Sequence, residues 1–369
     1  MATPLISDIH ELKNILHFTL SNVNFSIANA IRRTIMTDIP CFVFKTSPYS
    51  ESKCEIITNT CKLNNEIVKQ RLSCIPIHLT DTNMNIDNYS LILQKKNDTN
   101  NIIYVTTEDF QIYDNELNKF IDEAIVRKMF PPCPITNRYI DFLRLKPKIS
   151  NELFGEEIDL KCKFHIATAK ESGMYNVVST CAYGNTIDIE ESDKQWIKKE
   201  KELKKMETDS SQITIEKKNW NILNSQRYFI PDSFDYKIES IGIYKNQELI
   251  KKACDILIDQ LKNLDFNSNN IIIENSLSTI ANSFDITFID QDYTLGKVIE
   301  YFMYHNYYEH EKTLNYCGFN KDHPHENKIL IRLGFKDEEK ASIDNVKVLF
   351  NHVFQEAIEL FEKINEQFK

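Results

Sequence analysis

Glycine is scarce in this sequence, with only seven residues among 369. They form neither the glycine-rich loop that cradles phosphate groups nor the G-x-S-x-G turn that exposes a catalytic serine. The nucleotide-binding and hydrolase classes that depend on these motifs are therefore disfavoured. Catalysis has no obvious place in the chain.

Long apolar runs are missing too. No window reaches the roughly 18 apolar residues that a membrane-spanning helix needs. Asp8, His10 and Glu11 stand where a signal peptide would be apolar. We therefore expect a soluble intracellular protein without membrane contact.

Paired cysteine motifs and excess positive charge are also absent. The nine cysteines are scattered and form no C-x-x-C pair, so neither a disulfide framework nor a zinc cluster is expected. The formal net charge of −10 opposes binding to nucleic acid, which depends largely on cations that neutralise phosphates. We expect reduced thiols, no bound cofactor and no direct nucleic-acid binding.

What the sequence does contain is a strand followed by an amphipathic helix. Residues 16–20, "LHFTL", alternate apolar and polar side chains as a half-buried strand does. The spacing then predicts a helix that is capped by Ser26 and ends before Pro40. Its apolar stripe consists of Ile27, Ala30, Ile31, Thr34 and Ile35.

The same unit recurs near the other end of the chain. Residues 284–288, "FDITF", alternate in the same way, and Thr294 follows them at the distance at which Ser26 follows 16–20. A strong amphipathic pattern also occurs twice, over 249–264 and over 346–368. Two alike modules in one chain can pair about a pseudo-twofold axis, as the subunits of a homodimer do.

A long interruption separates the parts of the first module. Between Cys41 and about Asp235 the runs "NIIYVTTEDF" and "IDLKCKFHIATA" have strand character, which indicates an inserted β-rich domain. The mixed charge run "ESDKQWIKKEKELKKMETDSSQ" at its end is typical of a solvated helix and loop.

Two clusters could still carry chemistry. Asp322, His323, His325 and Glu326 offer oxygen and nitrogen ligands to a metal, but Pro324 keeps the chain extended there. An exposed histidine-rich turn usually binds nothing.

Cys162 and His165 could form a nucleophilic pair, although their spacing on a strand is not that of an activated thiolate. These clusters leave open a second function, a Cys/His or metal-dependent hydrolase. A third possibility is a generic self-associating adaptor.

Arg32 and Arg33 stand beside the apolar stripe of the first predicted helix. Most helical arginines lie in water, and physical reasoning alone favours this interpretation. Alternatively, the planar guanidinium forks suit an assembly surface, because they pair with carboxylates bidentately.

Four stretches resemble the α-like subunits of multisubunit RNA polymerases. The first contains a motif similar to "NALRR", and the last contains one similar to "HTLGN" and a His-Pro loop. Together they resemble the third-largest subunit fused to the eleventh, as found in large nucleocytoplasmic DNA viruses. The stretches are "NFSIANAIRRTIMTDIP" (24–40), "LNNEIVKQRLSCIPIHL" (63–79), "FDYKIESIGIYKNQELIKKACDIL" (234–257) and "DYTLGKVIEYFMYHNYYEHEKTLNYCGFNKDHPHENKILIRL" (292–333).

This resemblance implies an α+β fold with two α-like dimerisation modules, each a mixed sheet with amphipathic helices. We expect the first module in 1–40 and 235–265, an inserted β-rich domain in 41–234, a linker in 266–281 and the second module in 282–369. Many larger partners of the family carry a four-cysteine zinc cluster in the insert, whereas residues 75–132 contain no cysteine.

The resemblance also implies a non-catalytic subunit that serves as the assembly platform of a DNA-directed RNA polymerase. Its partners would be the largest and second-largest subunits and small subunits resembling the tenth and twelfth. In the family the "NALRR" arginines face the second-largest, β-like subunit, so we expect Arg33 to be exposed in the free protein. For a virus, localisation in the virion and the host cytoplasm would follow; otherwise the protein would be intracellular with the polymerase.

The residues carried over from the resemblance form two groups. The expected subunit interface comprises Asn29, Arg32, Arg33, Glu66, Arg71, Thr294, Leu295, Gly296, His323 and Pro324. The expected dimerisation helices contribute Ile27, Ile31, Ile35, Val298, Ile299, Phe302, Phe350, Val353 and Phe361. Tyr293 and Lys297 depart from the family, which usually has His and Asn at these positions.

Overall fold

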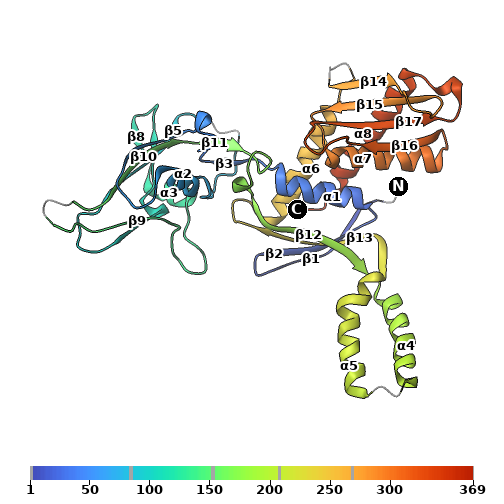
Figure 1. The fold of residues 1–369 in the computed structure, drawn as a ribbon, viewed down its shortest axis with the longest axis horizontal. Coiled ribbons are helices and arrows are strands. Elements are labelled where there is room, and N and C mark those ends of the chain that lie inside the picture. Colours follow the sequence, from blue (N-terminus) through green and yellow to red (C-terminus); the bar gives the residue numbers. More distant parts are fainter. Residues whose placement is uncertain (1–2, 83–85, 151–153, 207–208, 267–269, 369) are drawn as a thin grey trace. The chain divides into compact units, whose positions relative to one another are not determined.

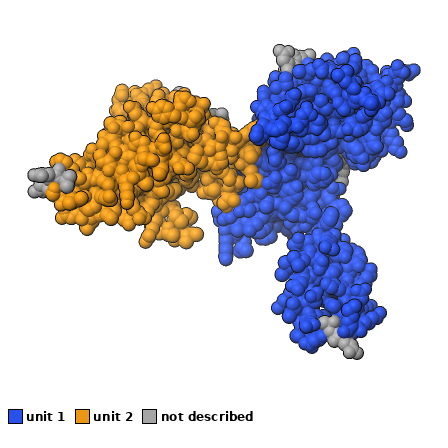
Figure 2. All heavy atoms as spheres, viewed as in Figure 1, with its two compact units in different colours: residues 1–35, 180–239, 246–369 blue, residues 36–179, 240–245 orange. Residues whose placement is uncertain are grey.

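The computed structural model describes residues 3–82, 86–150, 154–206, 209–266 and 270–368. The chain divides into two compact units (Figure 2): unit 1 contains residues 1–35, 180–239 and 246–369, and unit 2 contains residues 36–179 and 240–245. Within the described ranges, no helix is both long enough and apolar enough to cross a membrane.

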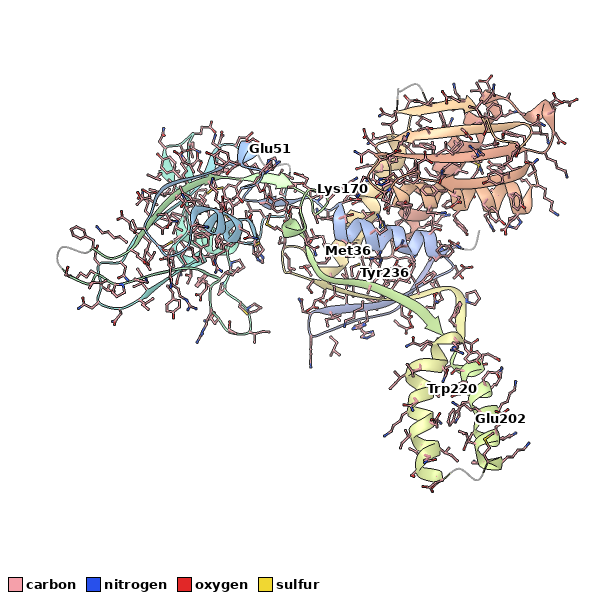
Figure 3. The ribbon with its side chains drawn as sticks, in the orientation of Figure 1. Met36, Glu51, Lys170, Glu202, Trp220 and Tyr236 are labelled. Carbon is pink, nitrogen blue, oxygen red and sulfur yellow. The ribbon has the colours of Figure 1, made fainter. Side chains whose placement is uncertain are left out.

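Unit 1 contains two modules, each a four-stranded sheet with helices against it (Figure 1). In the first module, alternation buries Leu16, Phe18 and Leu20 on one face of the sheet, where α1 and α6 pack. Tyr236 reaches from that face to donate a 2.6 Å hydrogen bond to the carbonyl oxygen of Ala28 in α1 (Figure 3). The strand order is β1 (Leu5–Leu12), β2 (Ile15–Ser21), β13 (Phe229–Ser240) and β12 (Val178–Ile187), and the helices are α1 (Phe25–Thr37) and α6 (Asn246–Lys262).

The second module has the same kind of frame. Ile286 and Phe288 of its central strand are fully buried, and so is most of the helix that follows. That helix continues beyond Met303 as a π-helical turn, Tyr304–His310. The strand order is β14 (Ile271–Asn275), β15 (Ser283–Ile289), β17 (Lys328–Phe335) and β16 (Leu314–Asn320), and the helices are α7 (Tyr293–Met303) and α8 (Ile343–Asn365).

The repeat is present in the structure with the predicted spacing. The second strand and helix begin at positions 283 and 293, and the first strand and helix begin at 15 and 25. The predicted caps, Ser26 and Thr294, were wrong. Asn24 and Asp292 cap these helices, and each side-chain oxygen accepts a hydrogen bond from the amide two residues on (2.9 and 2.8 Å). The real caps keep the spacing of the repeat.

The charged run between β12 and β13 forms a helical hairpin of α4 (Ile189–Lys205) and α5 (Ser210–Asn219). Trp196 and Trp220 meet between the helices with ring centroids 5.8 Å apart, and Trp220 donates a hydrogen bond to Ser192 (3.3 Å; Figure 3). The prediction of a solvated helix and loop was therefore incomplete, because two buried indoles give this segment a core of its own.

Unit 2 is rich in β-strands. Its five-stranded sheet packs on a core in which five phenylalanine rings contact one another, mostly edge-on or tilted: Phe44, Phe110, Phe130, Phe142 and Phe164. The five strands are β4 (Cys54–Asn59), β10 (Glu157–Lys163), β5 (Tyr89–Lys96), β7 (Gln111–Asp114) and β8 (Lys119–Phe120). Two strand pairs, β3 (Cys41–Val43) with β11 (His165–Ala167) and β6 (Ile103–Thr106) with β9 (Asp141–Leu145), and helices α2 (Asn65–Ser73) and α3 (Glu123–Met129) complete the unit.

The predicted domain edges differ from these units at several places. Residues 36–40 and 240–245 were expected in the first module, but they belong to unit 2. Residues 180–234 were assigned to the insert, but they belong to unit 1, because β12 joins β13 in the first module's sheet. The predicted linker 266–281 includes β14, which pairs with β15 as the edge strand of the second module. Hydrophobic periodicity alone could not show which sheet these strands join.

Candidate functional site

The two modules of unit 1 meet along their long helices, α6 and α8 (Figure 1). Asn365 near the end of α8 donates a 2.6 Å hydrogen bond to Asp255 of α6, and Lys262 lies 4.0 Å from Glu362. Apolar faces of both helices are buried beneath these polar contacts. The helices therefore form a continuous seam between the modules.

At one end of the seam, the chain after α8 reaches the sheet of the first module. Phe368 is 2% exposed and packs edge-on against Phe18 of β2, with centroids 5.2 Å apart. Gln367 accepts a hydrogen bond from the amide of Ile6 and donates one to the carbonyl oxygen of Pro4, both at 2.9 Å. The second module thus contributes side chains to the first module's sheet.

The chain after α6 makes the reciprocal contact with the second module. Phe266 packs against Phe350 and Phe354 of α8, each with centroids 6.1 Å apart. These two rings also surround Phe288 of β15. Each long helix is therefore followed by a phenylalanine that packs into the other module, as a pseudo-twofold pairing requires.

Arg33 of α1 joins this pairing from the side. Its Nε donates a 2.8 Å hydrogen bond to Thr294 Oγ1, and its Nη2 lies 3.2 Å from Asp292 Oδ2. Both charged side chains are 35% exposed. Arg33 is therefore only partly exposed in the free protein, because its carboxylate partner lies in the other module. Its expected contact with the β-like subunit stays a prediction.

Asp292 uses both of its oxygens. While Oδ2 faces Arg33, Oδ1 accepts from the amide of Thr294 and caps α7. A carboxylate at a helix N-terminus is favoured by the partial positive charge of that end. Asp292 therefore joins the start of α7 to α1.

Arg32 points in another direction, since successive residues of a helix are about 100° apart. Its Nε and Nη2 both donate to Asn29 Oδ1, at 3.0 and 2.9 Å. Burial raises the pKa of the Cys181 thiol in β12 to about 12, and the positive charge of Arg32 opposes that rise. Arg32 is thus close to the first module's own sheet, whereas Arg33 contacts the second module.

The residues expected on the dimerisation helices are all deeply buried, with at most 1% of each exposed. They are Ile27, Ile31, Ile35, Val298, Ile299, Phe302, Phe350, Val353 and Phe361.

Thr294, Leu295 and Gly296 of the "TLG" motif are buried in the first turn of α7. A Cβ at Gly296 would lie 2.3 Å from Phe319 Cε2 and 2.6 Å from Ile329 Cδ1. Only glycine therefore lets β16 and β17 approach α7 so closely. Their burial assigns Leu295 and Gly296 to packing within the module, whereas Thr294 also accepts the hydrogen bond from Arg33 of the first module.

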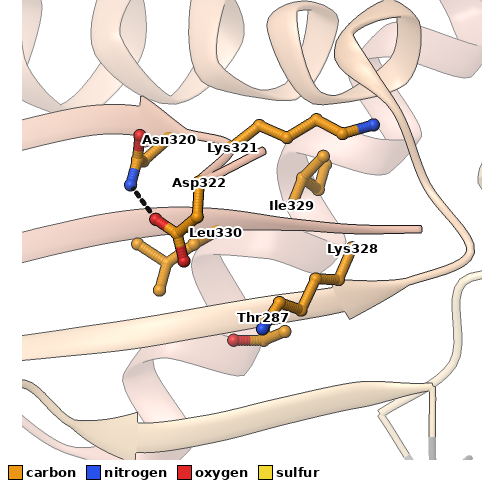
Figure 4. A pocket seen from close by; sticks show the side chains of 7 residues that line it. All are labelled: Thr287, Asn320, Lys321, Asp322, Lys328, Ile329 and Leu330. Carbon is orange, nitrogen blue, oxygen red and sulfur yellow. Dashed lines mark hydrogen bonds between the residues drawn. The ribbon is translucent and has the colours of Figure 1, made fainter. Parts of the chain in front are cut away.

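His323 and Pro324 lie in an exposed loop between β16 and β17. The amide of His325 donates to His323 Nδ1 at 3.2 Å. A nearby hollow, where Asn320 donates to Asp322 (Figure 4), has a volume of about 50 Å³, which is far below the roughly 300 Å³ of small ligand sites. In the part of the chain that the structure describes, no group of three or more His, Cys, Asp or Glu side chains could hold a metal ion.

Glu66 and Arg71 belong to unit 2, unlike the other expected interface residues. Glu66 is exposed in the first turn of α2. Arg71 donates to the carbonyl oxygens of Phe142 (2.7 Å) and Asp141 (2.8 Å), so it fixes α2 to β9.

Cys162 and His165 are not arranged as a nucleophile and its base. A hydrogen bond with Cys54 across the strands and complete burial raise the pKa of the Cys162 thiol. Burial and the neighbouring Lys53, whose Nζ lies 3.2 Å from the His165 ring, lower the pKa of His165. A reactive thiolate needs the opposite arrangement, a lowered thiol pKa beside a cationic imidazole.

Sequence reasoning missed Asp292, Phe266 and Gln367 as pairing residues. Aspartate is among the residue types preferred as helix N-caps, so Asp292, just before the apolar pattern, could have shown where α7 begins. Nothing local could have shown its contact with Arg33, which lies 259 residues earlier in the chain.

Comparison with known proteins gives two kinds of match. The family model for the RNA polymerase Rpb3/Rpb11 dimerisation domain matches residues 17–261, from β2 to α6. The Dictyostelium discoideum protein "DNA-directed RNA polymerases I and III subunit rpac1" is 25% identical over 321 residues, covering 75% of this chain and 83% of that protein. The Picrophilus torridus "DNA-directed RNA polymerase subunit Rpo3" is 38% identical over 84 residues, covering 21% of this chain and 31% of that protein.

Proposed function

The chain belongs to the RNA polymerase Rpb3/Rpb11 dimerisation domain family, and on this premise we propose that it is a non-catalytic assembly subunit that carries both halves of such a dimer in one polypeptide. The Dictyostelium relative is a subunit of RNA polymerases I and III, and the archaeal relative is also a polymerase subunit. The resemblance stated from the sequence is thereby confirmed at the level of the family. The fusion of two halves is our proposal.

The observation that carries this proposal is the reciprocal pairing inside unit 1. Phe368 packs on the first module's sheet, while Phe266 packs into the second module's aromatic core. The second module lies beyond the stretch matched by the family model, yet it repeats the strand and helix of the first at a constant spacing. A chain that already contains both partners needs no second α-like subunit.

The paired modules would present docking surfaces to the largest and second-largest polymerase subunits, which we expect to carry out nucleotide addition. Among the expected interface residues, Glu66, His323 and Pro324 are exposed and available for such contacts. Small subunits resembling the tenth and twelfth stay predicted partners. The viral origin and the localisation in virion and cytoplasm stay predictions as well.

The hydrolase alternative has no observation in its favour. Its thiol candidate, Cys162, is buried with a raised pKa, and its metal candidate, the loop around His323, is an exposed turn beside a very small hollow. The proposal of a non-catalytic subunit therefore rests on the family and on the pairing.

The test is affinity purification of the tagged full-length protein from its native source, followed by native mass spectrometry. We expect two very large polypeptides to co-elute at one copy each, with a single copy of this chain, and the eluate to synthesise RNA from a DNA template. A matched sample with Phe350→Asp, which places a charge in the buried aromatic core, should lose both partners. Elution of the native protein alone, or with a second α-like subunit, would contradict the proposal.

A further inference from the structure

The equivalent positions of the two modules carry different chemistry where α1 meets α7. When the two helices are aligned at their first residues, Arg33 corresponds to Tyr301, and Asn24 corresponds to Asp292. The first module therefore contributes the cation of Arg33 and the neutral amide cap of Asn24. The second module contributes an anionic cap and a neutral phenol at the equivalent positions. At this contact of α1 with α7, the two modules have the same arrangement of strand and helix but carry different charges.

At the start of α7, the guanidinium group of Arg33 meets the carboxylate of Asp292. Arg33 donates to Thr294 Oγ1 at 2.8 Å and lies 3.2 Å from Asp292 Oδ2, and both charged side chains are about two-thirds buried. The planar guanidinium thus satisfies a hydroxyl and a carboxylate at once, which an ammonium group could not do with the same geometry.

At the related position of the second module stands Tyr301, whose ring contacts Phe302 and His305. Burial raises the pKa of Tyr301, and so does the negative charge of Asp232. Asp232 is placed at the start of α1, because its carbonyl oxygen accepts a hydrogen bond from Val23, just before the Asn24 cap. The repeat thus aligns the neutral phenol of Tyr301 with the cation of Arg33.

We propose that Arg33 and Asp292 determine which modules pair, so that a first module binds a second module in preference to a copy of itself. This inference rests on the proposed function, because it takes the two modules as dimerisation halves. In a pair of first modules, Arg33 would face the neutral Asn24 cap at both ends in place of the Asp292 carboxylate. Asp232, near that cap, is exposed to water, so its charge would replace that of Asp292 only in part. In a pair of second modules, Tyr301 would meet Asp292 at both ends, and each carboxylate would lose its cation.

Charge exchange between two full-length chains tests the inference. Differently tagged Arg33→Asp and Asp292→Arg variants are unfolded, then refolded alone and together. Within either variant, positions 33 and 292 carry charges of the same sign. When the first module of one variant pairs with the second module of the other, these two positions carry opposite charges. Native mass spectrometry of the mixture should show dimers of the two tags about fivefold above the dimers that either variant forms alone.

Wild-type protein treated in the same way should stay mostly monomeric, because its own seam is already complementary. Mixed dimers that are no more frequent than the dimers of each variant would overturn the inference. The same holds if Arg33→Asp alone refolds with the wild-type unfolding midpoint and stays monomeric, since like charges at the seam would then have no effect.

A milder pair of variants keeps the test valid if Asp292→Arg fails to fold for lack of a cap. Asp292→Asn removes the charge but keeps a good capping side chain, and Arg33→Gln removes the cation. In a double-mutant cycle on the full-length protein, the double variant should lower the unfolding midpoint no further than the more damaging single variant. Additive shifts would overturn the inference.

Capture of the large polymerase subunits is measured on the same wild-type preparation. If the wild-type protein captures both subunits but the charge exchange gives no mixed dimers, only the pairing inference fails. If the charge exchange gives mixed dimers but the wild-type protein captures neither subunit, the proposed function fails and the pairing rule stands.

Discussion

The two modules of unit 1 share a frame of strand, helix and long amphipathic helix, but they differ in what interrupts it. In the first, unit 2 follows α1, and the α4–α5 hairpin separates β12 from β13. In the second, only short connections join α7 to β16 and β16 to β17. The long helices of the repeated frame make the pairing contacts, and the interruptions are what distinguishes the first module from the second.

The modules also differ at equivalent positions within the frame. Ala28 corresponds to Gly296, and His17, which stacks on His10, corresponds to Asp285, which pairs with Arg332. Each difference fits the neighbours of its own module. The two halves are therefore not interchangeable, although their backbones follow the same path.

The largest effect is expected from the phenylalanine core of the second module, whereas the aromatic cluster of the first module contains two tyrosines. Phe350 is fully buried among Phe266, Phe288 and Phe354, and Phe350→Ala should lower the free energy of unfolding by about 3–5 kcal/mol. Denaturant unfolding of the full-length protein measures the change. Phe25→Ala is the matched control, because Phe25 is 62% exposed and its removal should cost less than about 0.5 kcal/mol. Similar losses for both variants would contradict this core.

Phe266 and Phe368, which each pack into the other module, should differ in how much they contribute to the free energy of unfolding. Phe368 is 2% exposed, whereas Phe266 is only half-buried. We expect Phe368→Ala to cost about 3 kcal/mol of unfolding free energy and Phe266→Ala about 1–2 kcal/mol, in proportion to the apolar surface each removes from water. Equal losses, or a greater loss for Phe266→Ala, would show that the two ends of the seam are not packed as described.

Much of this frame could be predicted from local patterns. The alternation at 16–20 and 284–288 and the amphipathic runs at 249–264 and 346–368 gave β2, β15, α6 and α8. Periodicity works here because each element buries one face within its own module.

Contacts between distant segments could not be predicted in this way. The partner of Arg33 depends on the pairing of modules, and β12 joins β13 across the hairpin, so neither contact leaves a trace in the neighbouring residues. The helix caps were misplaced by two residues for a different reason. Each segment offers two residue types that can cap a helix, Asn24 and Ser26 in one and Asp292 and Thr294 in the other.

Gly296 provides a smaller test of the difference between the modules. Gly296→Ala should cost about 1–3 kcal/mol, because the added methyl group would overlap Phe319 and Ile329, whereas the first module accepts alanine at the equivalent position 28. Thermal unfolding measures the change. Gly184→Ala is the control, because a Cβ there meets nothing within 4 Å. A Gly296→Ala protein as stable as the control would show that β16 can move away from α7.

The smallest effect concerns pH and the pair of Asp285 with Arg332, which has no counterpart at His17. Arg332 donates to both carboxylate oxygens of Asp285, at 2.6 and 2.8 Å, and this hydrogen bonding lowers the pKa of Asp285. A lowered pKa in the folded state means that the pair stabilises the protein above the unfolded pKa of about 3.9 and that this stability is lost as the pH falls further.

Asp285→Asn should therefore cost about 1–2 kcal/mol at pH 7, and the variant and the wild-type protein should converge in stability toward pH 3. Urea unfolding at several pH values follows the difference, and Arg332→Gln should show the same convergence. A difference that persists unchanged at pH 3 would mean that Asp285 acts through packing. In that case the two modules would differ in shape at this strand and not in charge.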